Sequence, residues 1–210
     1  MSGQARILLV SGSTRRGSTN SAALATAAEI APSQVTAVLY DGLAELPAFN
    51  PDHDGDLLPA GPAQLRRQIG ESDAVLFCTP EYAGTLPGSL KNLLDWSVGG
   101  GEFDRKPAAW INVAAPGRGK GAEDSLMAVL GYVGADIVEA ACRRIPVDRD
   151  AIGPDGTVIG LKFAVEIAEV WDALLSHLGK LLRTRSPPAD CWNERISMVK
   201  HLTGAYVKAC

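Results

Sequence analysis

The sequence is short of the residues that define several common classes of protein. Its four cysteines are far apart and form no Cys-x-x-Cys pair, so neither a disulfide framework nor a zinc site is expected. Its 24 acidic and 20 basic residues give a net charge of −4, which argues against a nucleic-acid-binding protein. No apolar run approaches the roughly 20 residues that cross a bilayer, and the apolar start is too short for a signal peptide. We therefore expect a cytoplasmic globular protein with no membrane segment.

Short, continuous apolar runs indicate strands that are buried on both faces. The clearest are Ile7–Val10, Ala74–Cys78 and Trp110–Ala115, and two less regular runs are Gln34–Tyr40 and Ile137–Cys142. Such runs are typical of a parallel sheet, whereas a strand with one solvated face alternates polar and apolar residues. The sequence therefore predicts five parallel strands.

Helical patterns alternate with these runs. Good helix formers, or apolar residues at helical spacing, mark five segments: Asn20–Ile30, Pro62–Ile69, Gly88–Trp96, Gly121–Val133 and Leu161–Leu182. Regular alternation of strand and helix predicts an α/β doubly wound sheet with helices on both faces. Ligands of this fold class bind beyond the carboxyl ends of the strands, so the loops after the first, third and fourth runs form the candidate site.

The loop after the first run has the composition of a phosphate-binding loop. Residues 11–21 read SGSTRRGSTNS and lead into a helix, so hydroxyls, guanidinium groups and the N–H groups of a helix start are close in sequence. Gly17 is followed by Ser18 and Thr19, so the loop lacks the lysine of a Walker loop. The dinucleotide fingerprint GxGxxG is also absent. We expect this loop to bind a phosphate; a simple helix cap with two solvated arginines is the alternative.

The loops after the third and fourth runs are suited to a planar ligand. Residues 79–96 read TPEYAGTLPGSLKNLLDW, so Tyr82 could stack on a ring while the backbone offers hydrogen bonds to its edge. Residues 115–121 read APGRGKG, which predicts a flexible, positively charged loop. This loop either binds an anion or is an exposed glycine loop with solvated charges. The segment DHDGD at 52–56 does not fit a calcium loop, and no GxSxG elbow of a serine hydrolase occurs.

Two of these segments together resemble a known family. GSTRRGSTN at 12–20 and PEYAGTLPGSLKNLLDW at 80–96 resemble the NADPH-dependent FMN reductases, a flavodoxin-like group of flavin, quinone, azo-dye and chromate reductases. The resemblance covers about residues 5–183 and implies a flavodoxin-like, five-stranded sheet in the order 2-1-3-4-5. The chain departs from the family at Ala83, where the family usually has Asn. It also departs in the glycine-rich loop near residue 116, which carries Pro116 and an extra cation where the family usually has a run of Ser and Gly.

The resemblance also implies which residues bind the cofactor. The phosphate of FMN would be held by Ser13, Arg15, Ser18, Thr19 and Asn20. The flavin ring and ribityl chain would lie along Pro80, Glu81, Tyr82, Ala83 and Gly84, and Gly117 would approach the pyrimidine side. No catalytic side chain and no metal is implied, because the flavin carries the chemistry.

The implied activity is that of an NAD(P)H oxidoreductase with ping-pong turnover. NADPH or NADH would deliver hydride to FMN and leave, and a small-molecule acceptor (a flavin, quinone, azo compound or metal oxyanion) would enter the same pocket. The resemblance also implies a homodimer or homotetramer. Two other classes stay open, namely an FMN electron carrier or redox-sensing module without nicotinamide turnover, and an interaction scaffold that binds no flavin.

The sequence predicts two parts, an FMN-binding domain over residues 1–185 and a C-terminal extension over residues 186–210. After Ser186-Pro187-Pro188, apolar residues recur at three- or four-residue spacing, among them Trp192, Ile196, Val199 and Tyr206. This spacing predicts a helix, and a short isolated helix must dock its apolar stripe on something to be stable. Its own domain and a partner subunit are the two candidate surfaces.

Overall fold

A computed structural model describes residues 4–55 and 57–185. The chain divides into two compact units, Met1–Leu175 and Ser176–Cys210, and the sheet lies in the first. The strands are β1 (Ala5–Ser11), β2 (Val35–Tyr40), β3 (Ala74–Cys78), β4 (Pro107–Asn112), β5 (Asp136–Ile137) and β6 (Arg143–Arg144). The α-helices are α1 (Thr19–Glu29), α2 (Ala60–Gly70), α3 (Gly88–Trp96), α4 (Lys120–Tyr132) and α5 (Leu161–Arg185), the last of which runs across the boundary between the units.

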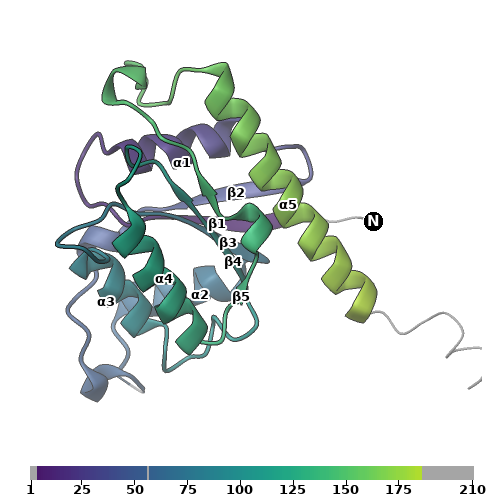
Figure 1. Cartoon of the computed structure of the whole chain (residues 1–210). Coiled ribbons are helices and arrows are strands. Elements are labelled where there is room, and N and C mark those ends of the chain that lie inside the picture. Colours follow the sequence, from purple (N-terminus) through teal and green to yellow (C-terminus); the bar gives the residue numbers. More distant parts are fainter. Residues whose placement is uncertain (1–3, 56, 186–210) are drawn as a thin grey trace, which may run out of the picture. The chain divides into compact units, whose positions relative to one another are not determined.

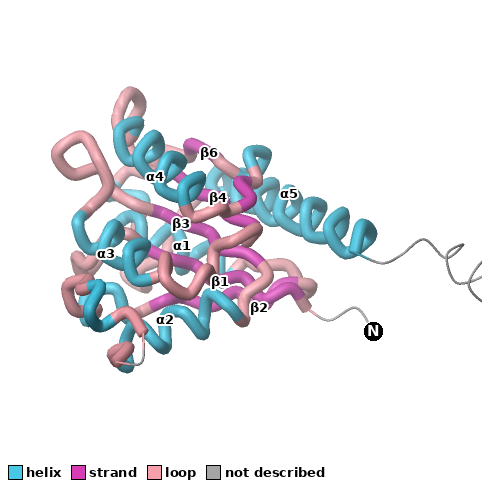
Figure 2. The backbone as a smooth tube through the Cα atoms, turned by 90° about the horizontal axis from the view of Figure 1, so that it is seen from below, coloured by secondary structure: helices cyan, strands magenta, loops and turns pink. Residues whose placement is uncertain are grey.

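The strands form one parallel sheet in the order β2-β1-β3-β4-β5, with β6 also paired to β4. Figure 2 shows β2, β1, β3, β4 and β6 of this sheet. At its carboxyl edge, Ser11 of β1 is in register with Cys78 of β3, and Cys78 is in register with Ile111 of β4. The predicted doubly wound, flavodoxin-like sheet with order 2-1-3-4-5 is confirmed. The loops that leave β1, β3 and β4 therefore begin at one edge of the sheet.

The fifth predicted strand is divided into two short segments. β5 pairs with β4 at Pro107 and Ala108, whereas β6 pairs with it at Ile111 and Asn112. A 3-10 turn over Glu139–Ala141 separates them. Glutamate and alanine have a low preference for strands, which explains why the run over 137–142 does not pair continuously.

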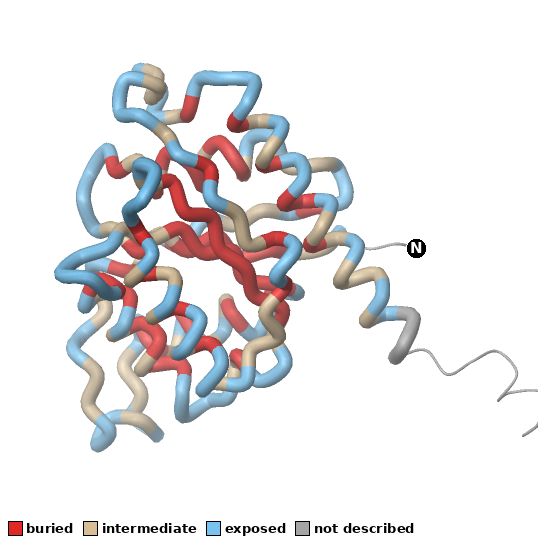
Figure 3. Tube along the Cα trace, in the orientation of Figure 1, coloured by how far each residue is buried: buried red, intermediate tan, exposed pale blue. Residues whose placement is uncertain are grey.

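The strands are buried on both faces, as their continuous apolar runs predict. Every residue of β3 and of β4 is buried, and Leu8 and Leu9, which point to opposite faces of β1, have no exposed surface. Figure 3 shows this buried sheet running through the middle of the first unit, between helices with one exposed side. Two-sided burial requires a layer of helices on each face.

Helices supply these two layers (Figure 1). On one face, Leu65 of α2, Leu94 of α3 and Leu126 of α4 belong to a single buried cluster with the strands. α1 and the first part of α5 cover the other face, where Nε1 of Trp171 donates a hydrogen bond to the carbonyl oxygen of Ala27 at 3.1 Å. The prediction of helices on both faces is confirmed.

The helix bounds follow the sequence pattern closely, and the strand ends less so. α3 has the predicted bounds, and α1, α2 and α4 begin and end within two residues of theirs. β4 ends at Asn112 rather than at Ala115, so the loop that follows it is longer than predicted. The predicted extension over residues 186–210 lies outside the described residues, so it and the proposed domain boundary at residue 185 stay predictions.

Candidate functional site

The β1–α1 loop packs directly against the residue that follows β3. The N–H of Gly12 donates to the carbonyl oxygen of Cys78 at 2.8 Å. A Cβ atom on Gly12 would lie 2.1 Å from Oγ1 of Thr79, far inside van der Waals contact. Glycine at position 12 therefore allows two loops from different strands to meet at the edge of the sheet.

Hydrogen bonds between its own side chains and backbone hold the β1–α1 loop in shape. The hydroxyls of Ser11 and Ser21 are 2.9 Å apart, and the Oγ of Ser13 accepts a bond from the Arg15 N–H at 3.3 Å. The Arg15 guanidinium donates to the carbonyl oxygen of Gly17 at 3.2 Å, so its exposed charge lies over the same loop. The loop is thus fixed before any ligand arrives.

Several backbone N–H groups of this loop remain available to an anion. The Oγ of Ser18 accepts from the Asn20 N–H at 3.2 Å and caps α1. Within residues 4–55 and 57–185, the N–H groups of Thr14, Arg16, Gly17, Ser18 and Thr19 donate no hydrogen bond. Unpaired N–H groups at the start of a helix, where the helix dipole is positive, suit a phosphate.

The β3–α3 loop contains a tight turn. Tyr82 and Thr85 exchange two backbone hydrogen bonds, with N···O distances of 3.0 and 3.1 Å. Between them Ala83 has φ of 50° and Gly84 has φ of 77°, so both central residues are left-handed, as in a type I′ turn. Asparagine tolerates this conformation better than alanine, so the Asn that the resembled family usually has here suits the turn. Tyr82 is 53% exposed.

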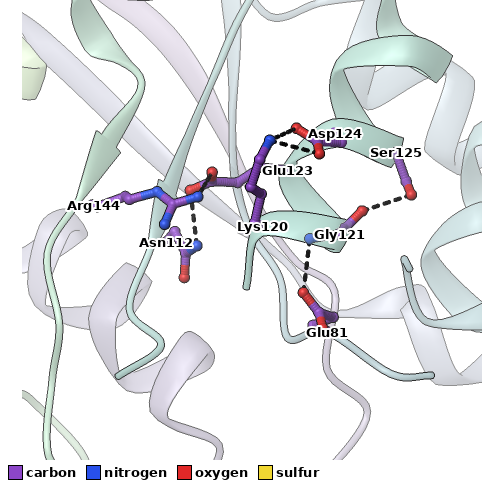
Figure 4. A network of polar contacts seen from close by, with 8 residues as sticks. All are labelled: Glu81, Asn112, Lys120, Gly121, Glu123, Asp124, Ser125 and Arg144. Atoms are coloured by element: carbon purple, nitrogen blue, oxygen red, sulfur yellow. Dashed lines mark hydrogen bonds and ion pairs between the residues drawn. The ribbon is translucent and has the colours of Figure 1, made fainter. Parts of the chain in front are cut away.

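Helix α4 holds this loop in place (Figure 4). The Gly121 N–H, near the start of α4, donates to Oε2 of Glu81 at 2.8 Å. The hydroxyls of Thr85 and Ser125 are 2.7 Å apart. A Cβ atom on Gly121 would lie 2.1 Å from the carbonyl oxygen of Gly84, so the loop backbone lies directly on the helix. The Glu81 side chain therefore anchors the loop to α4.

A second polar network fixes the loop after β4 (Figure 4). Asn112 accepts a bond from the Ala114 N–H at 2.9 Å and donates from Nδ2 to Glu123 at 2.8 Å. The other carboxylate oxygen of Glu123 forms an ion pair with Arg144 of β6. Gly119 precedes α4 with φ of 83°, and a Cβ there would lie 2.4 Å from Nδ2 of Asn112. The network thus ties β4, α4 and β6 together beside the candidate site.

These loops surround a cleft of about 350 Å³ at the carboxyl edge of the sheet. Four of the residues assigned by resemblance line it, namely Thr19, Asn20, Pro80 and Glu81. Eight more lining residues were not assigned: Thr79, Val113, Ala114, Ala115, Arg118, Gly119, Val147 and Arg149. Thr79, Ala115, Arg118 and Gly119 belong to the loops that the sequence indicated. Val113 and Ala114 were predicted to end the fourth strand, but they follow β4 and belong to the loop. Val147 and Arg149 follow β6, a part of the chain that sequence reasoning passed over.

The remaining assigned residues lie beside this cleft rather than among the residues that line it. Ser18 lines a separate cavity of about 360 Å³, together with Leu39 and Tyr40. Neither cavity is lined by the other assigned residues, which are Ser13, Arg15, Tyr82, Ala83, Gly84 and Gly117. Ser13 and Arg15 belong to the loop with the free N–H groups, and the other four lie on the exposed parts of the two loops that flank the cleft.

Cys78, the last residue of β3, is not a candidate nucleophile. Burial raises the pKa of its thiol far above the ordinary value, so the thiolate is not populated at neutral pH. Its Sγ lies 3.3 Å from Oδ1 of Asn20, which is a hydrogen bond in which the thiol donates. Cys78 therefore helps to orient Asn20, one of the residues that line the cleft.

The geometry suits a ligand with an anionic tail and a planar head. The free N–H groups of the β1–α1 loop can hold a phosphate, and Thr19 and Asn20 connect that loop to the cleft. FMN has this form, so the residues present fit it. In the part of the chain that the structure describes, no three metal-ligating side chains lie together, and no helix is long and apolar enough to cross a membrane.

Comparison with known proteins also points to FMN as the cofactor. The family model described as NADPH-dependent FMN reductase matches residues 5–145. An NAD(P)H-dependent FMN reductase of Pseudomonas aeruginosa is 39% identical over 117 residues, which are 55% of this chain and 63% of that protein. The 2-hydroxy-1,4-benzoquinone reductase of a Burkholderia species is 32% identical over 158 residues, covering 73% of this chain and 85% of that protein.

A solved structure agrees with these relatives. The flavoenzyme NAD(P)H:(acceptor) oxidoreductase of Paracoccus denitrificans superposes with a TM-score of 0.74 at 29% identity, covering 84% of this chain and 98% of that one. The expected oxidoreductase class, with FMN as cofactor and a nicotinamide nucleotide as co-substrate, is confirmed as that of the family. The chain belongs to the NADPH-dependent FMN reductase family.

Proposed function

We propose that this protein is an FMN-dependent NAD(P)H oxidoreductase that reduces a small-molecule acceptor of the quinone class by ping-pong turnover. The observation that carries the proposal is the position of the free N–H groups of the β1–α1 loop beside the cleft, both at the carboxyl edge of the sheet. The names of the Pseudomonas and Burkholderia relatives support FMN and a quinone.

Different residues of the site would bind different parts of FMN. The free N–H groups of Thr14 and of residues 16–19 would hold the phosphate, and the exposed Arg15 guanidinium would add a charge-assisted contact. Pro80 and the backbone after β4 would flank the ring. The chemistry that bound FMN would supply is hydride transfer from a nicotinamide nucleotide and electron transfer to the acceptor. The anchoring of the β3–α3 loop by Glu81 keeps this half of the cleft in position before either substrate enters.

Two measurements test the proposal. The purified protein, after incubation with FMN and removal of excess, should show flavin absorbance, and NADPH or NADH should bleach it without oxygen. Initial rates at several donor and quinone concentrations should then give parallel double-reciprocal lines, because both substrates use one cleft. Flavin that is retained but not bleached would favour an electron carrier or sensor, and failure to bind flavin would favour a scaffold. Intersecting lines would refute the single-cleft mechanism.

Assembly and location are further proposals. Homodimers or homotetramers are proposed because the resemblance implies them, and a cytoplasmic location is proposed on composition. Measurement of the mass in solution, with and without FMN, checks the first of these.

A further inference from the structure

Two arginines of the cleft have no partner within the described residues. Arg118 lies in the loop after β4 and Arg149 in the segment after β6, and both are exposed and line the cleft. No hydrogen bond or ion pair of either guanidinium occurs among residues 4–55 and 57–185. By contrast, Arg143 and Arg144 of β6 lie nearby in the sequence and pair with Glu166, Glu169 and Glu123. The two cleft arginines thus differ from their neighbours.

The other side chains that line the cleft leave this positive charge uncompensated. Glu81 is the one acidic residue among the described residues that line it. Its carboxylate accepts the Gly121 N–H at the positive end of α4, so its negative charge is already partly offset. The remaining lining residues are uncharged. A partly enclosed site with two guanidinium groups of this kind attracts anions and lowers their free energy when bound.

We propose that Arg118 and Arg149 form an anion-recognising rim, which selects molecules that carry a carboxylate, sulfonate or phosphate beside the ring that reacts. The inference rests on the proposed function, because it concerns what enters the same cleft. The proposed function gives the cofactor phosphate to the free N–H groups of the β1–α1 loop, so we assign the rim to the substrate. The anion can belong to the acceptor or to the phosphates of the nicotinamide nucleotide, and the two sources are separable by experiment.

The acceptor arm compares two quinones that differ in charge alone. One benzoquinone carries a propionate side chain and the other the corresponding propionamide, so the saturated linker keeps the ring potentials matched. The variants are Arg118→Gln, Arg149→Gln and the double variant. Arg67→Gln is the control, since it removes one positive charge from an exposed position on α2 that does not line the cleft.

Each single rim variant should lower kcat/KM for the propionate quinone about two- to fivefold, and the double variant about tenfold, as expected for exposed ionic contacts. The propionamide quinone should be unaffected, and so should both substrates in the control. Salt at about 1 M should remove the difference, since the Debye length is then about 3 Å. Equal losses for both quinones, or no loss for either, would overturn the acceptor assignment.

The donor arm measures flavin reduction by NADPH and by NADH without any acceptor. Selective slowing with NADPH in the rim variants assigns the rim to the extra phosphate of the donor, whereas an effect confined to the propionate quinone assigns it to the acceptor. If neither half-reaction depends on substrate charge in these variants, the rim does not exist.

Equilibrium binding separates this inference from the proposed function. Without a nicotinamide, the same two quinones bind to the oxidised holoprotein and do not react. The propionate quinone should bind more tightly than the amide, and the double variant should abolish that difference. This result would support the rim even if the protein turned over neither quinone. Equal affinities of the unaltered protein for the two quinones would refute recognition of an anionic acceptor.

Discussion

Replacing Gly121 with alanine should destabilise the protein, although alanine is the better helix former. Gly121 is the second residue of α4, where helix propensity alone predicts a gain. A Cβ atom there would lie 2.1 Å from the carbonyl oxygen of Gly84 and 2.7 Å from its carbonyl carbon. Both atoms are backbone and cannot move aside by changing a rotamer. Either the start of α4 or the turn at Ala83 and Gly84 must therefore shift.

The size of the effect follows from this overlap. Restoring a contact of about 3.4 Å requires a displacement of more than 1 Å, and overpacking of this kind costs about 1–3 kcal/mol. The same shift strains the hydrogen bond from the Gly121 N–H to Glu81, which as a bond to a charged group is worth about 1.5–3 kcal/mol when intact. We expect a loss of about 2–4 kcal/mol in the free energy of unfolding, and a fall in Tm of about 5–15 °C.

Gly131, in the same helix, provides the matched control. A Cβ atom there would meet no atom within 4 Å, and its φ is not positive. Gly131→Ala should therefore raise the stability by about 0.5–1 kcal/mol. Both variants are compared by urea unfolding and by fluorescence titration with FMN, for which Gly121→Ala should also show weaker binding. If Gly121→Ala is as stable as the unaltered protein, the loop does not lie on the helix as described.

Three further changes have expected outcomes. Ala83→Asn should raise the stability by about 0.5–1 kcal/mol in urea unfolding, because asparagine tolerates the left-handed φ of 50° better than alanine; a loss would contradict the type I′ turn. Burial, aided by the negative charges of Asp41 and Glu45, raises the pKa of Tyr40 to about 12. The unfolded phenol titrates near pH 10, so the stabilisation is complete below about pH 10 and is lost as the pH rises towards 12. Tyr40→Phe should lose less stability than the unaltered protein between pH 9 and 11.5, and identical profiles would argue against a buried phenol. Arg15→Ala should weaken FMN binding about three- to tenfold in a fluorescence titration, a modest effect because the side chain is exposed; unchanged affinity would remove Arg15 from the phosphate site.

Local sequence patterns were sufficient for the main elements of the fold. Continuous apolar runs such as Ala74–Cys78 indicated two-sided burial, which the parallel sheet between two helical layers explains. Helix bounds were predicted closely because helical spacing is a property of one segment. The division of the fifth strand into β5 and β6 was not predicted, because whether Glu139 pairs or turns depends on its register with β4.

The candidate site could be predicted loop by loop but not side chain by side chain. The loops after β1, β3 and β4 were indicated by composition together with the rule that ligands bind at carboxyl strand ends. The anchoring role of Glu81 depends on its distance from Gly121, 40 residues along the chain, and no local pattern shows that. Arg149 was missed because the segment after β6 was not considered as part of the site. The available signal was an arginine that follows a strand at the carboxyl edge of the sheet.

The division of the fifth strand also affects how the sheet can meet other chains. An unpaired strand edge offers free N–H and C=O groups to a neighbouring chain and is a starting point for aggregation. At one edge, β5 and β6 are each two residues long, and a turn between them interrupts continuous strand pairing. Both residues of β6, Arg143 and Arg144, are positively charged, which also disfavours pairing with another strand. At the other edge, β2 is a six-residue strand with the sequence VTAVLY, and its Leu39 is 46% exposed. Intermolecular strand pairing of a partly unfolded chain should therefore begin at β2, and a lysine in place of Leu39 is the substitution that would protect this edge.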